Sequence, residues 1–162
     1  MRDDASIEGA IAAHGDAVWR TCLMRMGSRA DAEDAFQETF MSYALRDDVV
    51  FEGPEHERAW LLRVASNRCL DVLRSAAHAV GSLDEDAREA PAPLRPSEDP
   101  SAGLWEVSQA LDRLPGTQRQ AIYLTVCEGY PAGEVAEMMG VPVNTVYSWV
   151  ARGKESLRKA LG

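Results

Sequence analysis

The side chains best suited to chemistry lie near the C-terminus, on one face of a helix predicted over residues 143–161. That face carries amide, hydroxyl and basic groups, which hydrogen-bond to base edges in the DNA major groove and to phosphate oxygens. The candidate DNA-contacting residues are Asn144, Thr145, Tyr147, Ser148, Arg152 and Lys154. Because such a helix enters the groove by its first turns, the first four would contact bases and the last two mainly phosphates.

The residues before this helix make the pattern more specific. A short helix over 132–139 carries Val135, Ala136 and Met139, and a tight Gly140-Val141-Pro142 turn separates it from the longer helix. This is the spacing of a helix-turn-helix motif, which places its second helix in the major groove. The inner seam of the second helix is Val146, Val150, Gly153, Leu157 and Leu161. Trp149 lies about 60° from that seam and is expected to pack at the edge of the domain.

A second polar line lies on a helix predicted over residues 57–75. Arg63, Asn67, Leu70 and Arg74 point outward together. The opposite, inner seam is Leu61, Ala65, Cys69 and Val72. Two arginines and an asparagine along one line could contact phosphates and bases, and a solvated surface is an equal alternative.

A third surface belongs to a helix predicted over residues 31–45. At 100° per residue, five side chains fall on one contiguous face, opposite the apolar stripe that contains Phe36. They are Asp34, Gln37, Glu38, Met41 and Leu45. Two apolar residues among acids suit docking of a basic protein partner, and a solvated face is the alternative.

Residues that could catalyse a reaction or bind a metal form no recognisable set. His14, His56 and His78 lie far apart without a matching nucleophile or ligand pattern, and no Gly-rich phosphate loop is present. The three cysteines are Cys22, Cys69 and Cys127. Their spacing offers neither a disulfide framework nor a metal site, so we expect small buried hydrophobic residues. The sequence predicts no enzyme, no cofactor and no metal.

Charge separates the last helix from the rest of the chain. The 162 residues carry a net charge of −9, which argues against coating of nucleic acid by bulk charge. Within 144–161, in contrast, the basic residues Arg152, Lys154, Arg158 and Lys159 face a single acid, Glu155. No apolar run approaches the roughly 18 residues that cross a bilayer, and the start lacks a signal-peptide pattern, so the expected compartment is the cytoplasm.

The chain is expected to be all-α, with two small helical domains at 1–78 and 104–162. Apolar residues recur at spacings of three and four in both, without strand-like alternation. Between them, residues 79–103 contain four prolines within ten residues and predict a flexible linker. The two domains are therefore expected to move independently. Helices are predicted at 6–26, 31–45, 57–75, 104–113, 116–128, 132–139 and 143–161.

Two strings of residues carry a family resemblance. The first comprises Asp31-Ala-Glu-Asp34, Gln37-Glu38, Phe40, Arg58-Ala-Trp60-Leu-Leu-Arg63-Val-Ala-Ser-Asn67 and Leu70-Asp71-Val-Leu73-Arg74. The second comprises Ala110-Leu-Asp-Arg-Leu114-Pro115, Glu128-Gly129, Glu134-Val-Ala136-Glu-Met-Met-Gly140-Val and Thr145-Val146. They resemble regions 2 and 4 of the extracytoplasmic-function (ECF) sigma factors, in the order and at the separation found in that family.

The resemblance implies a bacterial RNA polymerase initiation factor that is not an enzyme. Region 2 would bind the polymerase clamp and open the minus-ten element, and region 4 would bind the polymerase flap and the minus-35 element. The face of helix 31–45 is assigned to the polymerase; Arg63, Asn67 and Arg74 to the minus-ten element; and 144–154 to the minus-35 groove. Opening DNA would use binding energy, with unstacked bases held in region 2. An anti-sigma partner is also implied.

The sequence departs from the family pattern at several positions that are commonly basic. Ser66 replaces a common arginine, Tyr147 and Trp149 occupy commonly basic positions, and 75–78 lacks the family's further basic residues. Fewer phosphate contacts predict weak binding to free DNA and dependence on the polymerase, or an unusual promoter preference. The alternatives are a polymerase-binding, sigma-like regulator that has lost promoter recognition and a stand-alone helix-turn-helix regulator.

Overall fold

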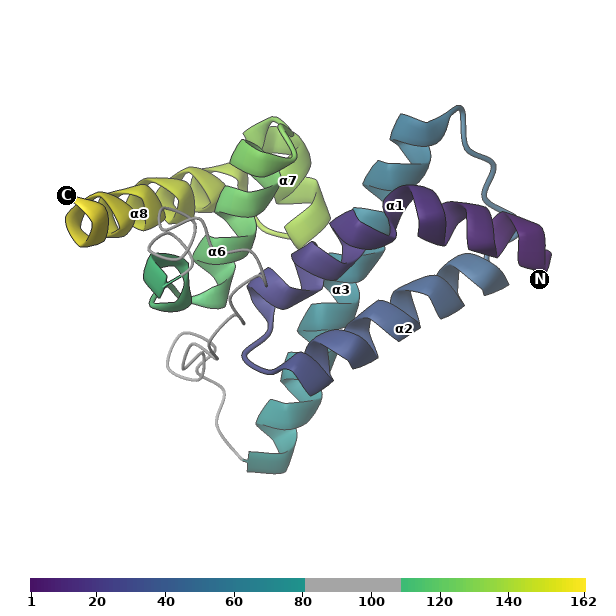
Figure 1. The fold of residues 1–162 in the computed structure, drawn as a ribbon, viewed down its shortest axis with the longest axis horizontal. Coiled ribbons are helices and arrows are strands. Elements are labelled where there is room, and N and C mark those ends of the chain that lie inside the picture. The colour runs from purple at the N-terminus through teal and green to yellow at the C-terminus, as the bar shows by residue number, and fades with distance from the viewer. Residues whose placement is uncertain (81–108) are drawn as a thin grey trace.

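The computed structural model describes residues 1–80 and 109–162, and no strand occurs among them (Figure 1). The N-terminal half contains α1 (Asp4–Arg25), α2 (Arg29–Leu45) and α3 (Pro54–Val80). The C-terminal half contains α6 (Gly116–Ile122), the π-helical segment η1 (Tyr123–Cys127), α7 (Ala132–Met139) and α8 (Val143–Leu161). The all-α prediction is confirmed, whereas the predicted linker lies almost entirely outside the described residues.

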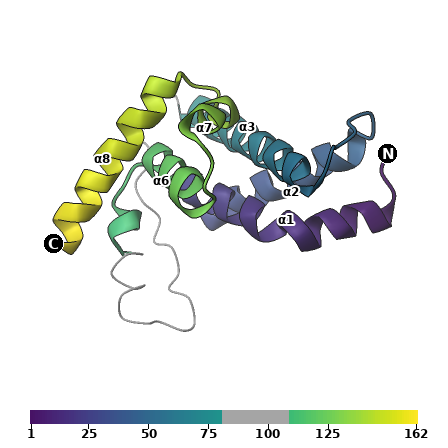
Figure 2. The ribbon, with the colours of Figure 1, turned by 90° about the horizontal axis from the view of Figure 1, so that it is seen from above.

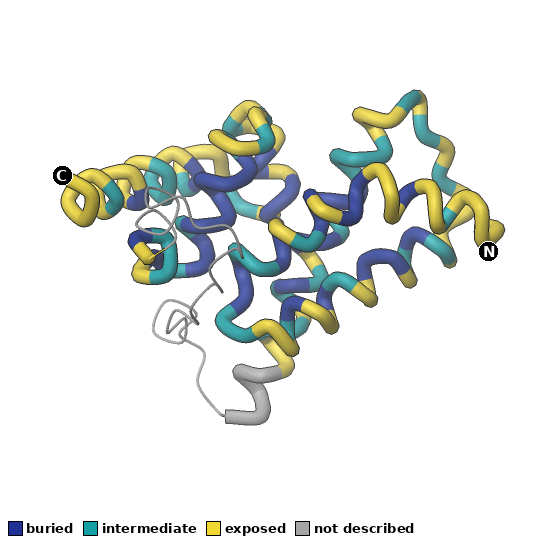
Figure 3. Tube along the Cα trace, viewed as in Figure 1, coloured by how far each residue is buried: buried dark blue, intermediate teal, exposed yellow. Residues whose placement is uncertain are grey.

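The N-terminal half is a bundle in which α1, α2 and α3 all pack against one another. Side chains cap the N-termini of the first two helices. The Asp3 carboxylate accepts a hydrogen bond from the Ser6 amide at 2.8 Å, and the Ser28 hydroxyl accepts one from the Asp31 amide at 3.1 Å. The inner faces of the three helices are buried (Figure 3). A chain of ring contacts at one end of the bundle joins Trp19, Phe36, Phe40, Tyr43, Phe51 and Trp60.

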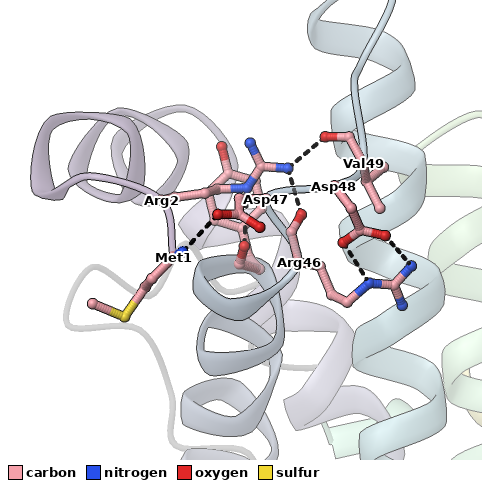
Figure 4. Close-up of polar contacts among 7 residues, drawn as sticks. Met1, Arg2, Arg46, Asp47, Asp48 and Val49 are labelled. Atoms are coloured by element: carbon pink, nitrogen blue, oxygen red, sulfur yellow. Dashed lines mark hydrogen bonds and ion pairs between the residues drawn. The ribbon is translucent and has the colours of Figure 1, made fainter.

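Arg2 ties the N-terminus to the end of α2 and to the loop that follows (Figure 4). Its guanidinium donates to the carbonyls of Tyr43 at 2.9 Å, Arg46 at 2.9 Å and Val49 at 2.7 Å, and it lies over the Tyr43 ring. A cation at the C-terminus of a helix satisfies carbonyls that have no partner within the helix. The loop between α2 and α3 is therefore fixed at its α2 end.

The C-terminal half forms the helix-turn-helix that the sequence predicts. Gly140 ends α7 with a φ of 69°, a left-handed conformation that favours glycine, and Val141 donates a backbone hydrogen bond to Ala136 at 3.1 Å. α8 then begins directly after Pro142. The absence of a side chain at Gly153 leaves room for the end of the Ile122 side chain and allows close packing of α8 on α6.

The two halves lie against each other in this structure. α7 packs against α3, and α6 packs against α1 (Figure 2). Buried side chains from both halves belong to one continuous core, which includes Leu61 and Cys69 as well as Leu124 and Val135. Sequence periodicity identifies the buried face of each helix but does not indicate which other helix covers it.

Three predicted positions of apolar residues are wrong. The spacing of apolar residues over 6–26 predicts that Ile7, Ile11, Val18, Cys22 and Met26 lie on one side of α1, yet Ile11 is 41% exposed. Leu161 is 45% exposed near the end of α8. Cys127 is exposed as the last residue of the π-helical segment η1, whereas Cys22 and Cys69 are buried as expected. In α1 the buried stripe instead includes His14, whose Nε2 lies 3.3 Å from Oε1 of Glu57, so a polar residue with a partner replaces an apolar one.

Candidate protein and nucleic-acid interfaces

The first candidate surface lies on α2. All five side chains that the sequence places on one face are exposed, with Met41 at 64% and Leu45 at 63%. The opposite face of α2 is buried through Ala32, Ala35 and Phe40. Exposed apolar groups beside Asp34 and Glu38 form a mixed surface with both an apolar and an electrostatic component. We call the face of Asp34, Gln37, Glu38, Met41 and Leu45 the α2 surface.

The second candidate surface lies on α3, where Arg63, Asn67 and Arg74 are exposed on the side predicted from the sequence. Arg63 lines a cavity of about 320 Å³ whose other wall includes Glu134 and Glu137 of α7. Arg74 lines a second cavity of about 180 Å³, between α3 and the C-terminal half. Arginine side chains suited to phosphate contact therefore border the junction between the two halves.

The third candidate surface lies on α8. Asn144, Tyr147, Arg152 and Lys154 are exposed, and Thr145 and Ser148 are partly buried. Val146 and Gly153 on the opposite side are buried against the rest of the motif. The six polar side chains thus remain accessible on a helix whose back is fixed by α6 and α7.

Trp149 does not belong to the accessible face of α8. It is partly buried, packs against the common core, and lines the cavity that also contains Arg74 and Leu70 of α3. Packing at the edge of its domain is as expected, although the surface it meets belongs to the other half. Leu70, placed outward by the sequence, is partly buried at the same junction.

Polar contacts between the halves were not found by sequence reasoning. Arg58 of α3 forms an ion pair with Glu128, and the Tyr123 hydroxyl donates to the same carboxylate. Burial, followed by that hydrogen bond, raises the pKa of Tyr123. Gln120 Nε2 donates to Ser66 Oγ at 2.8 Å. Arg58, Ser66 and Glu128 all lie within the quoted motifs, yet partners 54 and 70 residues apart leave no periodic signal.

Among residues 1–80 and 109–162, no helix is both long and apolar enough to cross a bilayer. The same ranges contain no group of three or more His, Cys, Asp or Glu side chains that could share a metal ion.

Comparison with known proteins defines the class. A model of sigma-70 region 2 matches residues 10–79, and a model of sigma-70 region 4 matches residues 104–157. The helix-turn-helix of α7 and α8 therefore lies in a region 4 match, and the α2 and α3 surfaces lie in a region 2 match. These matches indicate a sigma-70-type factor, which is a non-enzymatic transcription initiation factor.

Individual relatives narrow the class. The ECF sigma factor SigM of Mycobacterium tuberculosis is 36% identical over 146 residues, which cover 86% of this chain and 70% of SigM. SigL of the same species is 30% identical, over 91% of this chain and 84% of SigL. SigE of Mycolicibacterium smegmatis is 34% identical, and the chain spans 58% of its length. The chain belongs to the family of ECF RNA polymerase sigma factors.

Two solved structures share the fold. The sigma factor RpoE, in complex with the anti-sigma factor NepR from Bartonella quintana, aligns with a TM-score of 0.75 at 24% identity, over 96% of both chains. CnrH, in complex with the cytosolic domain of CnrY, aligns with a TM-score of 0.60 at 24% identity, over 98% of this chain and 89% of CnrH.

Proposed function

We propose that this chain directs RNA polymerase to specific promoters through three separate surfaces. The α2 surface binds the clamp of the core polymerase, α3 binds the minus-ten element, and α8 binds the minus-35 element. The observation that carries this proposal is that each predicted contact set is accessible while the opposite face of its helix builds the core. Membership of the ECF sigma family supplies the partner class.

The α2 surface suits a protein partner better than DNA. Asp34 and Glu38 would repel phosphates, whereas exposed Met41 and Leu45 offer apolar area that water solvates poorly. A basic partner surface would gain both the charge attraction and the apolar burial. We therefore assign polymerase binding to this helix, and flap binding to the C-terminal half as the resemblance implies.

The α3 surface suits an opened minus-ten element. Arg63 and Arg74 can neutralise phosphates, and the Asn67 amide can both donate to and accept from a base edge. Strand opening makes and breaks no covalent bond, so it requires only that single-stranded DNA bind more tightly than the duplex. The chain itself catalyses no reaction under this proposal.

The α8 surface suits the duplex of the minus-35 element. Asn144 and Thr145 lie in the first turn, where a recognition helix contacts bases, and Arg152 and Lys154 lie two turns further on. Four basic residues among 144–161 offset the acidic balance of the chain locally. Binding to free DNA is nevertheless weak under this proposal, because Ser66, Tyr147 and Trp149 supply no phosphate contact.

An anti-sigma factor is a further proposed partner. Two solved structures with this fold are complexes, one of RpoE with the anti-sigma factor NepR and one of CnrH with the cytosolic domain of CnrY. We also place the chain in the cytoplasm, where the polymerase acts.

The test is transcription in vitro with purified core polymerase and a library of promoter sequences. We expect initiation from a subset of promoters that share minus-ten and minus-35 sequences, and none from core polymerase alone. Binding to the core without initiation from any promoter would refute promoter recognition and support the sigma-like regulator instead. That second candidate is favoured by the non-basic residues at positions 66, 147 and 149.

A further inference from the structure

We propose that this arrangement is a closed state of the protein, unable to bind a complete promoter, and that the Arg58–Glu128 ion pair is the latch that holds it. The inference rests on the proposed function for what opening permits. The latch itself rests on contacts between the two halves.

The distance between promoter elements excludes simultaneous binding in this arrangement. Elements centred near positions −10 and −35 are about 25 base pairs apart, which is roughly 85 Å of duplex at 3.4 Å per base pair. α3, the longest helix among the described residues, has 27 residues and a length of about 40 Å. Because α7 packs directly on α3, the helix-turn-helix lies far closer to the minus-ten surface than the DNA requires. The halves must separate before both elements are bound.

The closed arrangement also places acidic groups of α7 where the minus-ten DNA would lie. Glu134 and Glu137 line the same cavity as Arg63. On the other side of the junction, Trp149 and the turn at Gly140 and Val141 line the cavity of Arg74. The negative charge of α7 thus competes with phosphates for the environment of Arg63, and bulky groups of the C-terminal half stand beside Arg74.

The Arg58–Glu128 ion pair is only partly buried and is suited to form and break reversibly. The Glu128 side chain is only 8% exposed and receives both the Arg58 guanidinium and the Tyr123 hydroxyl, whereas the Arg58 side chain is 32% exposed. Water regains both charges when the halves separate, so the net gain from an intact pair is small. Removing Arg58 leaves the Glu128 charge buried and uncompensated, which strongly favours the open state, in which it is hydrated, whereas removing the Glu128 charge takes away the attraction that holds Arg58.

A second contact explains one departure from the family pattern. Ser66 is 6% exposed, and its hydroxyl accepts from Gln120 of the C-terminal half. An arginine at this position, as is common in the family, would carry a charge into the buried junction and would lose the Gln120 contact. Serine at position 66 suits the closed state at the expense of a DNA contact.

The experiment compares full-length Glu128→Gln and Arg58→Met with wild type by small-angle X-ray scattering and by promoter-dependent transcription at limiting sigma concentration. Both variants should show a larger radius of gyration and a several-fold rise in initiation. The charge-exchanged double variant Arg58→Glu/Glu128→Arg should return toward the wild-type radius. Asp71→Asn, which removes the acid of an exposed ion pair within α3, is the matched control and should change neither.

The outcomes distinguish failure of the ion-pair latch from failure of the proposed promoter recognition. An unchanged radius in both single variants, with helicity intact by circular dichroism, would overturn the latch. A larger radius with wild-type initiation would overturn the competition between closing and promoter binding. If wild type and all variants fail to initiate from any promoter while the radius still responds, the proposed function is refuted and the latch stands. Arg58→Met, at the more exposed partner, keeps the test valid if Glu128→Gln does not fold.

Discussion

The two halves of this sigma factor begin their helices in different ways. In the N-terminal half, the side chains of Asp3 and Ser28 cap α1 and α2, whereas α3 begins at Pro54. In the C-terminal half, α6, α7 and α8 follow Pro115, Pro131 and Pro142, and none has a side-chain cap. The two capped helices thus gain a hydrogen bond at their first turn, whereas the helices that begin at or after a proline gain from the restricted backbone of that residue.

The halves also differ in what they bury. The bundle of α1, α2 and α3 encloses an apolar and aromatic interior that includes Leu61, Phe40 and Tyr43. α6 has seven residues and α7 eight, and among the largest fully buried side chains of the C-terminal half are the polar Arg119 and Gln120. Both contact the N-terminal half, at Met26 and Ser66. The junction therefore combines these polar contacts with apolar side chains of the common core.

The largest expected effects come from truncating one buried leucine in each half, which tests whether the two halves depend on each other equally. Leu61→Ala in α3 should lower the free energy of unfolding by about 2–5 kcal/mol, because the bundle cannot close around the lost volume. Hydrogen exchange should rise in both halves, since α7 packs on α3. Leu124→Ala, an equally buried change in η1, should raise exchange in α6, α7 and α8 while the bundle stays protected.

The control is Ile11→Ala, at a 41% exposed position in α1, which should change stability by no more than about 0.5 kcal/mol. Equal exchange in both halves after Leu124→Ala would show that the bundle depends on the C-terminal half as much as the reverse, contrary to the comparison.

Contacts with the minus-35 element should show the next largest effects, and these belong to the C-terminal half. Asn144→Ala should change which minus-35 sequence is preferred, at roughly 1–3 kcal/mol, because a lost base contact affects one position. Arg152→Ala and Lys154→Ala should weaken use of all promoters and lower the slope of log affinity against log salt by about 0.9 each. Initiation by all three at the wild-type level from every promoter would show that α8 does not bind DNA.

Charge reversal on the α2 surface of the N-terminal half should weaken binding to the core polymerase. Reversing both charges in Asp34→Lys/Glu38→Lys should weaken binding to core polymerase about tenfold or more, or ~1.4 kcal/mol, because a basic partner would then meet like charge. Helicity should stay unchanged, since both side chains are exposed. Glu8→Lys/Asp16→Lys, which makes the same charge change on exposed positions of α1, is the control in the pull-down. Equal core binding by both double variants would remove the assignment of the α2 surface.

Local features of this protein could be predicted from the sequence, whereas long-range ones could not. The bounds of α7 and α8 and the exposed α2 surface follow from helical spacing and from Gly140 and Pro142, which act within a few residues. His14 belongs in the core only because Glu57 lies beside it. Likewise, the contact of Ser66 with Gln120 depends on how two halves pack, and no pattern within either half encodes it. Arg63 and Arg74, which the family motif assigns to DNA, also line the cavities between the two halves.

Substitutions at the N-cap positions of α2 and α8 should have the smallest effects on the free energy of unfolding, and they compare the two kinds of helix start directly. Ser28→Ala removes the acceptor for the Asp31 amide and should lower the free energy of unfolding by about 1 kcal/mol. Pro142→Ala removes no hydrogen bond at the start of α8, so its cost of about 0.4–1 kcal/mol arises from greater freedom of the unfolded chain. Urea denaturation measures both losses, and exchange at the first turns separates their origins. Fraying of α2 is expected in the first variant, with no matching change in α8 in the second. If Pro142→Ala instead increases exchange throughout the first turn of α8, proline stabilises the folded helix itself, and the capped α2 and the proline-led α8 do not begin by different physical means.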